Sequence, residues 1–120
     1  MIRDIHMLKK EVLRRKEDFN RIYKKGRSVG DRYVVIFCLK NGMDYNRLSL
    51  LASKKVGNSV RRNRARRLMR ESVRHIEIEN KGYDFIIIAR NTINDKKCAD
   101  VKKSIEAALK RLKIDYKTGD

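Results

Sequence analysis

The element that decides the fold lies in residues 53–78, which read SKKVGNSVRRNRARRLMRESVRHIEI. Its apolar and small residues recur at the spacing of one helical face, which predicts a buried stripe along an amphipathic helix. The stripe consists of Ala65, Leu68, Met69, Ser72, Val73 and Ile76. Asn58 or Ser59 can cap the start of this helix. We therefore predict one long helix that begins at either residue and runs to about Ile78.

The opposite side of this predicted helix is almost wholly cationic. Between residues 54 and 74, nine Lys or Arg residues stand against a single acid, Glu71. A solvated helix normally alternates charge signs, because each opposite pair at i,i+4 contributes ~0.3 kcal/mol and each like pair costs a similar amount. Here Arg62, Arg66 and Arg70 repeat one sign at that spacing. Solvated surface is the ordinary explanation of a polar face, but this pattern favours a polyanionic ligand.

The whole chain shares this excess of positive charge. It has 120 residues and a formal charge of +17, from 32 Lys plus Arg against 15 Asp plus Glu. The size predicts a single domain over residues 1–120, and the charge indicates a phosphate backbone or an anionic membrane surface as partner. The longest apolar run, residues 85–89, is far shorter than the roughly 20 residues of a membrane span. Since the first residues also lack a signal-peptide core, we expect a cytoplasmic protein that binds nucleic acid.

Residues suited to catalysis or metal binding are scarce. Cys38 and Cys98 lie far apart and predict reduced thiols rather than a disulfide, a zinc site or a redox motif. His6 and His75 are expected on the surface, and the remaining acids, such as Asp84, show no recognisable pairing for metal or proton chemistry. We therefore expect no catalytic residue, no metal site and no tightly bound cofactor in the protein itself.

The rest of the chain predicts an α+β fold. Residues 1–15 are basic with weak periodicity, which is typical of a flexible arm. Asn41-Gly42 is a hairpin signal between the second and third predicted strands, and the last strand is apolar throughout, which predicts a central position. The full order is αβββαβα, a two-layer sandwich with a mixed sheet. Outside the basic helix, the predicted helices and strands span residues 16–25, 27–30, 32–40, 47–53, 83–90 and 95–112.

Several motifs of this chain resemble those of the bacterial ribonuclease P protein subunit. They are Lys54-Lys55-Val56-Gly57-Asn58-Ser59-Val60, Arg62-Asn63-Arg64, Arg66-Arg67, Arg70-Glu71, Glu17-Asp18-Phe19, Lys25-Gly26 and Tyr83-Asp84-Phe85-Ile86-Ile87-Ile88-Ala89-Arg90. That family has an αβββαβα sandwich, in agreement with the order predicted above. The resemblance also implies a left-handed βαβ crossover through the basic helix, although about 98% of such connections are right-handed.

The resemblance implies a protein subunit of an RNA enzyme. In that family the RNA subunit holds the catalytic Mg²⁺ ions and removes the 5′ leader from precursor tRNA, while the protein binds the catalytic RNA and the leader. The basic face predicts, and the resemblance implies, RNA contacts at Lys54, Lys55, Arg62, Asn63, Arg64, Arg66, Arg67, Arg70 and Arg74.

The resemblance also implies a leader-binding cleft between the first helix and the open face of the sheet. The matching positions are Phe19, Tyr23, Phe37, Arg32 and Arg90. Aromatic rings bind single strands by stacking, worth ~1–3 kcal/mol per base, over a cationic surface. From the residues alone, packing in the core is the ordinary explanation for Phe19 and Phe37.

Two other classes of nucleic-acid-binding protein compete with this interpretation. A structural RNA-binding protein, such as a ribosomal one, could share the same sandwich and the same basic helix. The Phe19/Tyr23 pair beside the basic motif favours the ribonuclease P subunit, because a scaffold has no evident need for it. A DNA-reading helix would offer varied side chains to the base edges, whereas this face is nearly all arginine.

Overall fold

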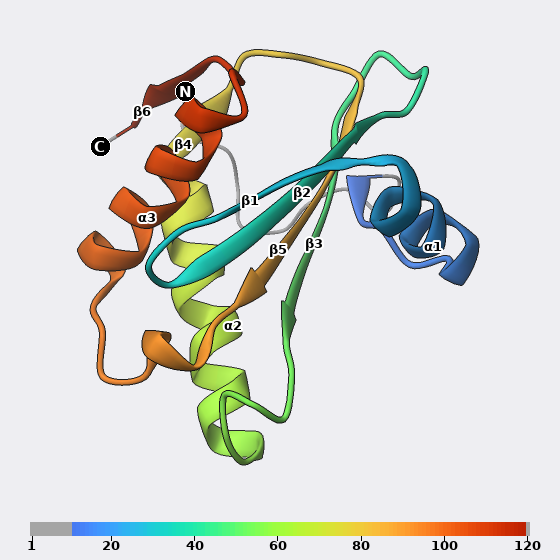
Figure 1. Cartoon of the computed structure of the whole chain (residues 1–120). Coiled ribbons are helices and arrows are strands. Elements are labelled where there is room, and N and C mark those ends of the chain that lie inside the picture. Colours follow the sequence, from blue (N-terminus) through green and yellow to red (C-terminus); the bar gives the residue numbers. More distant parts are fainter. Residues whose placement is uncertain (1–10, 120) are drawn as a thin grey trace.

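The computed structural model describes residues 11–119 and has the predicted α+β fold (Figure 1). Most of the expected arm over residues 1–15 lies outside the described residues. The elements, in chain order, are α1 (Lys16–Lys25), β1 (Arg27–Gly30), β2 (Val34–Lys40), β3 (Arg47–Ala52), α2 (Ser59–Arg74), β4 (Ile76–Ile78), β5 (Tyr83–Ala89), the short 3₁₀ helix η2 (Asn91–Ile93), α3 (Cys98–Arg111) and β6 (Tyr116–Thr118).

The main sheet is mixed, as predicted, and has the strand order β1-β2-β5-β3. β2 pairs antiparallel with β1 and with β5, whereas β3 pairs parallel with β5. The predicted hairpin between β2 and β3 is therefore wrong, because β5 lies between these two strands. β5 is apolar on both faces, with Phe85 and Ile86 both buried, so it takes the internal position. The parallel unit β3–α2–β5 is the predicted crossover connection, and its left hand remains a prediction of the resemblance.

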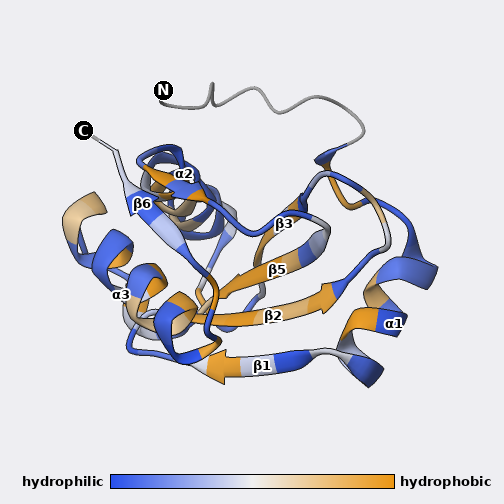
Figure 2. Cartoon of the chain, turned by 90° about the horizontal axis from the view of Figure 1, so that it is seen from above, coloured by the Kyte–Doolittle hydropathy of each residue, from blue (hydrophilic) through white to orange (hydrophobic). Residues whose placement is uncertain are grey.

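The two faces of the sheet are covered unequally (Figures 1 and 2). Helices α2 and α3 pack on one face, where Val34, Ile36 and Cys38 of β2 join the main core. Helix α1 lies on the other face, and there Phe37 and Leu39 pack against a smaller cluster that buries Leu13, Ile22 and Ile86. Because side chains alternate along a strand, β2, β3 and β5 each contribute side chains to both cores. The face under α1 is the less completely covered one.

Helix α2 ends at Arg74, one turn earlier than predicted. The next residues, Ile76–Ile78, form β4, which pairs antiparallel with β6 in a second, two-stranded sheet. The Ile-Glu-Ile sequence alternates with the period of a strand rather than that of a helix. Ile76 is buried, as the predicted stripe requires, but it reaches the core from the strand. Neither short strand was predicted.

Residues 11–13 also differ from the prediction of a flexible arm. Val12 forms an isolated bridge with Leu48, and the backbone N–H of Leu13 donates to the carbonyl of Leu48 at 3.1 Å. The side chain of Leu13 is only 3% exposed, because it packs into the smaller core beside α1. The predicted arm is therefore wrong for these three residues. Within residues 11–119, no helix combines the length and the apolar character needed to cross a bilayer.

Candidate RNA interface

The segment before α2 has a fixed backbone conformation. The side chain of Asn58 caps the helix by accepting a hydrogen bond from the backbone N–H of Arg61 at 3.0 Å. Gly57 has φ 140°, and a Cβ at this position would lie 2.7 Å from the side chain of Arg61. Glycine is therefore required here. From the opposite side, the amide of Asn94 donates to the carbonyl of Val56 at 2.8 Å.

The arginine face is the row of cations along the outer side of α2. The inner side buries Ala65, Met69 and Ser72, which confirms the predicted stripe for those residues. On the outer side Arg67 and Arg70 are exposed. Within residues 11–119 neither makes a hydrogen bond or an ion pair. Lys54 and Lys55 are exposed in the segment that precedes the helix, so the unpaired charge continues past its N-terminus.

Other predicted RNA contacts are partly engaged by the protein. Arg62 donates to the hydroxyl of Ser59 at 3.2 Å, and Arg66 donates to the amide oxygen of Asn63. Both partners are neutral, so the charge of each guanidinium is not compensated. Asn63 itself is exposed.

Arg64 and Arg74 depart furthest from the predicted arrangement. Arg64 turns toward the loop after η2 and donates to the carbonyl of Lys96 at 2.7 Å. Arg74 forms an ion pair with Glu71 at 3.3 Å. Among the predicted contacts on α2, Arg74 is thus the one that a described carboxylate neutralises. Conversely, Arg61 was counted among the cations but was not assigned to the site, and it is exposed at the start of the face.

The aromatic cluster consists of Phe19, Tyr23 and Phe37. The ring centroids of Tyr23 and Phe37 are 5.0 Å apart in an edge-on arrangement, and those of Phe19 and Tyr23 are 6.4 Å apart. Tyr23 is 42% exposed, whereas Phe19 and Phe37 are half-buried in the smaller core. Partial burial raises the pKa of the Tyr23 hydroxyl, so this group keeps its proton at neutral pH. The structure therefore brings together the three predicted rings, with one of them open to solvent.

Arg32 and Arg90 do not join the aromatic cluster. Arg32 precedes β2 and Arg90 follows β5, at the end of the sheet where Val34 pairs with Ala89. Phe37 lies five residues farther along the chain than Arg32, roughly 16 Å at the usual rise of a strand. Arg90 also donates to the carbonyl of Asp31 at 2.9 Å. Both arginines are exposed, and their part in the leader-binding cleft stays a prediction of the resemblance.

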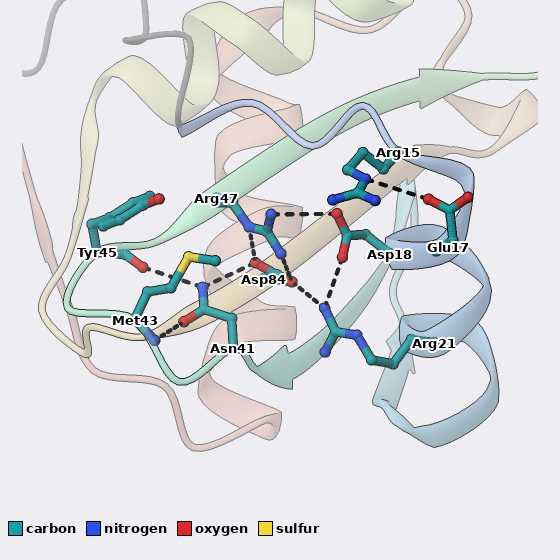
Figure 3. A network of polar contacts seen from close by, with 9 residues as sticks. All are labelled: Arg15, Glu17, Asp18, Arg21, Asn41, Met43, Tyr45, Arg47 and Asp84. Carbon is teal, nitrogen blue, oxygen red and sulfur yellow. Dashed lines mark hydrogen bonds and ion pairs between the residues drawn. The ribbon is translucent and has the colours of Figure 1, made fainter.

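A charge network that was not predicted joins α1 to β3 and β5 (Figure 3). At its centre is Asp84, which is fully buried. The guanidinium of Arg47 donates to both of its oxygens, from Nε at 2.8 Å and from Nη2 at 2.7 Å. Arg21 of α1 donates to Asp84 Oδ2 at 2.9 Å, and the amide of Asn41 donates to Oδ1 at 2.9 Å. Burial raises the pKa of the Asp84 carboxyl, but these hydrogen bonds outweigh it and hold the pKa below its usual value.

Asp18 closes the network from the helix side. Its carboxylate accepts from Arg21 and from Arg47, each at 3.3 Å. The hydrogen bond to Asp84, followed by the nearby carboxylates, raises the pKa of Arg47. The two acids thus share two arginines, whereas the sequence predicts no ion pair for Asp84, which we considered only for metal or proton chemistry. Apart from the local Asp18–Arg21 pair, the contacts join distant parts of the sequence. Only an expected contact between α1 and the ends of β3 and β5 could have indicated them.

The fold and the arginine face define the class of this chain as a small, basic, RNA-binding α+β protein. The chain belongs to the ribonuclease P protein family, since the family model described as Ribonuclease P matches residues 7–113. The ribonuclease P protein component of Pelotomaculum thermopropionicum is 42% identical over 106 residues, which cover 88% of this chain and 95% of that protein. That of Clostridioides difficile is 43% identical over 105 residues, or 85% and 91% of the two chains.

Solved structures show the same relationship. A Staphylococcus aureus RNase P protein, described as a mutant with defective mRNA degradation activity, superposes with a TM-score of 0.78 at 37% identity, covering 89% of this chain and 92% of that one. The RNase P protein of Thermotoga maritima has a TM-score of 0.72 at 34% identity, with coverage of 84% and 96%. These likenesses support the ribonuclease P family and not the alternative of a ribosomal protein.

Proposed function

We propose that this chain is the protein subunit of ribonuclease P, which binds the catalytic RNA and the 5′ leader of precursor tRNA and assists removal of the leader. Beyond the family membership, one observation carries the proposal. Arg67 and Arg70 are exposed on α2 and, within residues 11–119, have no carboxylate partner. An RNA backbone supplies the negative charge that this surface lacks.

The arginine face is suited to phosphate. A guanidinium presents a planar fork that can bind two phosphate oxygens at once. Arg61, Arg67 and Arg70 are exposed, and within residues 11–119 their guanidinium groups have no hydrogen-bond or ion-pair partner. Lys54 and Lys55 extend the charge to the N-terminus of α2, where backbone N–H groups and the helix dipole also favour anions. The proposed ligand of this face is the catalytic RNA, together with the part of the substrate that lies beside it.

The aromatic cluster is suited to a single strand. The exposed part of the Tyr23 ring offers a flat apolar surface beside Phe37, and a base stacked there is worth ~1–3 kcal/mol. Such stacking tolerates any sequence, as a subunit that serves many precursors requires. The 5′ leader is therefore the proposed ligand of this cluster.

The proposal assigns catalysis and the Mg²⁺ ions to the RNA subunit, as the family resemblance implies. Within residues 11–119, no group of three or more His, Cys, Asp or Glu side chains is arranged to hold a metal ion. The protein's contribution would be to bind and orient the two RNAs and to offset their charge. We also place the assembled enzyme in the cytoplasm.

The test is reconstitution with a catalytic RNA and a precursor tRNA at low magnesium. We expect cleavage at the leader junction to require the protein and the RNA together, and the protein's affinity for the RNA to fall steeply with salt. Cleavage by the protein alone would contradict the assignment of catalysis to the RNA. An affinity that does not change with salt would contradict the arginine face as the contact.

The leader contact is tested in the same reconstituted enzyme with Tyr23→Ala. We expect binding of a leader-bearing precursor to weaken roughly 5- to 150-fold, which corresponds to one lost stack, while binding of mature tRNA stays unchanged. Met43→Ala is the matched control, because Met43 is 40% exposed in a turn away from the cluster, against 42% for Tyr23. Equal losses on both RNAs would refute the leader contact.

A further inference from the structure

Helix α1 depends on tertiary contacts for its position. It has ten residues, and its N-cap residue Arg15 makes no side-chain capping bond. A helix of this length is marginal in isolation. Ile22 is its one buried residue. Its orientation over the sheet is therefore set by the packing of Ile22, with Phe19 and Tyr23 beside it, and by its polar contacts with the strands.

The polar contacts and the aromatic rings lie on opposite sides of Ile22. Successive helical residues are rotated by about 100°. Asp18 and Arg21 therefore lie on one side of Ile22, and Phe19 and Tyr23 lie on the other. Arg21 reaches Asp84 on β5, whereas Tyr23 contacts Phe37 on β2. Any rotation of α1 that breaks the ion pairs must also move the rings relative to the sheet.

The charge network forms a closed ring of alternating sign: Asp18, Arg21, Asp84, Arg47 and back to Asp18. Two of its members belong to α1, one to β3 and one to β5. Asp84 and Arg47 are almost inaccessible, with side chains 0% and 13% exposed, and they are fixed to neighbouring strands. Asp18 and Arg21 are the residues of α1 that form ion pairs with this fixed pair.

We infer that this ring of four charges is a positioning device for leader recognition, in which Arg21 and Asp18 fix the rotation of α1 and so hold Tyr23 where a leader base can stack. The inference deepens the proposed function and rests on it. Arg21 and Asp18 are positioning residues, because they act through Tyr23 and Phe19 rather than on RNA.

Arg21 is the residue at which positioning can be separated from folding. Its side chain is 34% exposed. Without it Asp84 still accepts two hydrogen bonds from Arg47 and one from Asn41. The buried carboxylate is thus never left unpaired, which is the change that normally destabilises a protein strongly.

The experiment uses the reconstituted enzyme with Arg21→Met, which keeps an apolar stem but loses the charge. Lys24→Met is the matched control: it removes the same charge from the same helix, at an exposed residue without a described partner. We expect Arg21→Met to weaken binding of the leader-bearing precursor roughly fivefold or more, the loss of about one stack. Mature tRNA should bind as before, and Lys24→Met should change neither affinity by more than about twofold.

Leader affinity of a double variant distinguishes a positioning role of Arg21 from a merely structural one. Since Arg21 acts largely through Tyr23, adding Arg21→Met to Tyr23→Ala should cost much less leader affinity than Arg21→Met costs alone, so the two effects should be non-additive. Arg21→Lys, which keeps a cation near Asp84, should recover part of the loss.

The possible failures can be told apart. If Tyr23→Ala abolishes leader recognition but Arg21→Met does not change it, the positioning role is overturned and the proposed leader contact stands. If Arg21→Met weakens both RNAs equally, general destabilisation is the cause, and the positioning role is again overturned. If Tyr23→Ala itself has no selective effect, the leader contact proposed for this cluster fails, and the inference fails with it.

Discussion

Two sets of arginines in this molecule have opposite surroundings. Arg21 and Arg47 lie against two carboxylates, and Arg47 is 13% exposed. Arg67 and Arg70 lie on the outer side of α2 without a carboxylate partner in residues 11–119. The first set is neutralised within the protein and joins elements of the fold, whereas the second leaves its charge for a ligand. The pairing of an arginine, rather than its presence, therefore indicates its role.

The largest expected effect is that of removing Asp84, the carboxylate at the centre of the charge network. Asp84→Ala would leave Arg47 buried without its main partner, and we expect it to lower the free energy of unfolding by ~3–5 kcal/mol. Urea denaturation followed by circular dichroism measures this, with Asp44→Ala in an exposed turn as the control. A change below about 1 kcal/mol would show that the network does not hold the fold together.

Low pH should weaken the ion pair between Asp84 and Arg47. The folded-state pKa of Asp84 is held below its ordinary value. Its contribution to stability is therefore present above the unfolded pKa of about 3.9 and is lost as the pH falls through the folded pKa. We expect Asp84→Asn to reduce the loss of stability between neutral pH and about pH 3. Parallel pH–stability curves for the variant and the natural protein would contradict this expectation.

The unpaired set should show the converse behaviour. Arg70→Gln removes one charged hydrogen-bond donor, worth ~1.5–3 kcal/mol, so affinity for the catalytic RNA should fall roughly ten- to a hundredfold. The slope of log affinity against log salt should become shallower by about one, and the free energy of unfolding should stay within ~0.5 kcal/mol. Lys103→Gln on the exposed side of α3 is the control. If Arg70→Gln lowered stability without weakening RNA binding, Arg70 would serve the fold rather than the RNA, contrary to the proposal.

The smallest effect concerns Arg74, which stands between the two sets. Glu71 pairs with it at 3.3 Å, and both side chains are about 40% exposed. Exposed ion pairs contribute ~0–1 kcal/mol, so Glu71→Gln should hardly change stability. It should strengthen RNA binding by about two- to fivefold, because a further guanidinium becomes available. Unchanged affinity would indicate that Arg74 lies outside the interface.

The parts of the molecule that were predicted correctly depend on local patterns. The helical stripe through Ala65 and Met69 and the continuous apolar run of β5 both lie within one short stretch of sequence. The arginine face is likewise a property of a single helix. In each case the information lies within one short segment, as helical periodicity for α2 and as a continuous apolar run for β5.

The errors concern long-range pairing. The Asn41-Gly42 turn is a genuine turn, with Gly42 at φ 74°, but a local signal cannot reveal that β5 separates the two strands it connects. The Asp84 network joins residues from Asp18 to Asp84, and its local part, Asp18/Arg21, looks like any i,i+3 surface pair.

The internal position of β5 has a consequence for how the chain folds during synthesis. Among the strands in residues 11–119, β3 pairs in the main sheet with β5 alone. β5 ends at Ala89, 37 residues after the end of β3 at Ala52. At about 5–20 residues per second, the ribosome needs roughly 2–7 seconds to make that segment. Throughout this interval β3 lacks its strand partner in the main sheet, and of its final backbone partners only the short segment at Val12 and Leu13 has already been made. The main sheet therefore cannot be completed until about three-quarters of the chain has been translated.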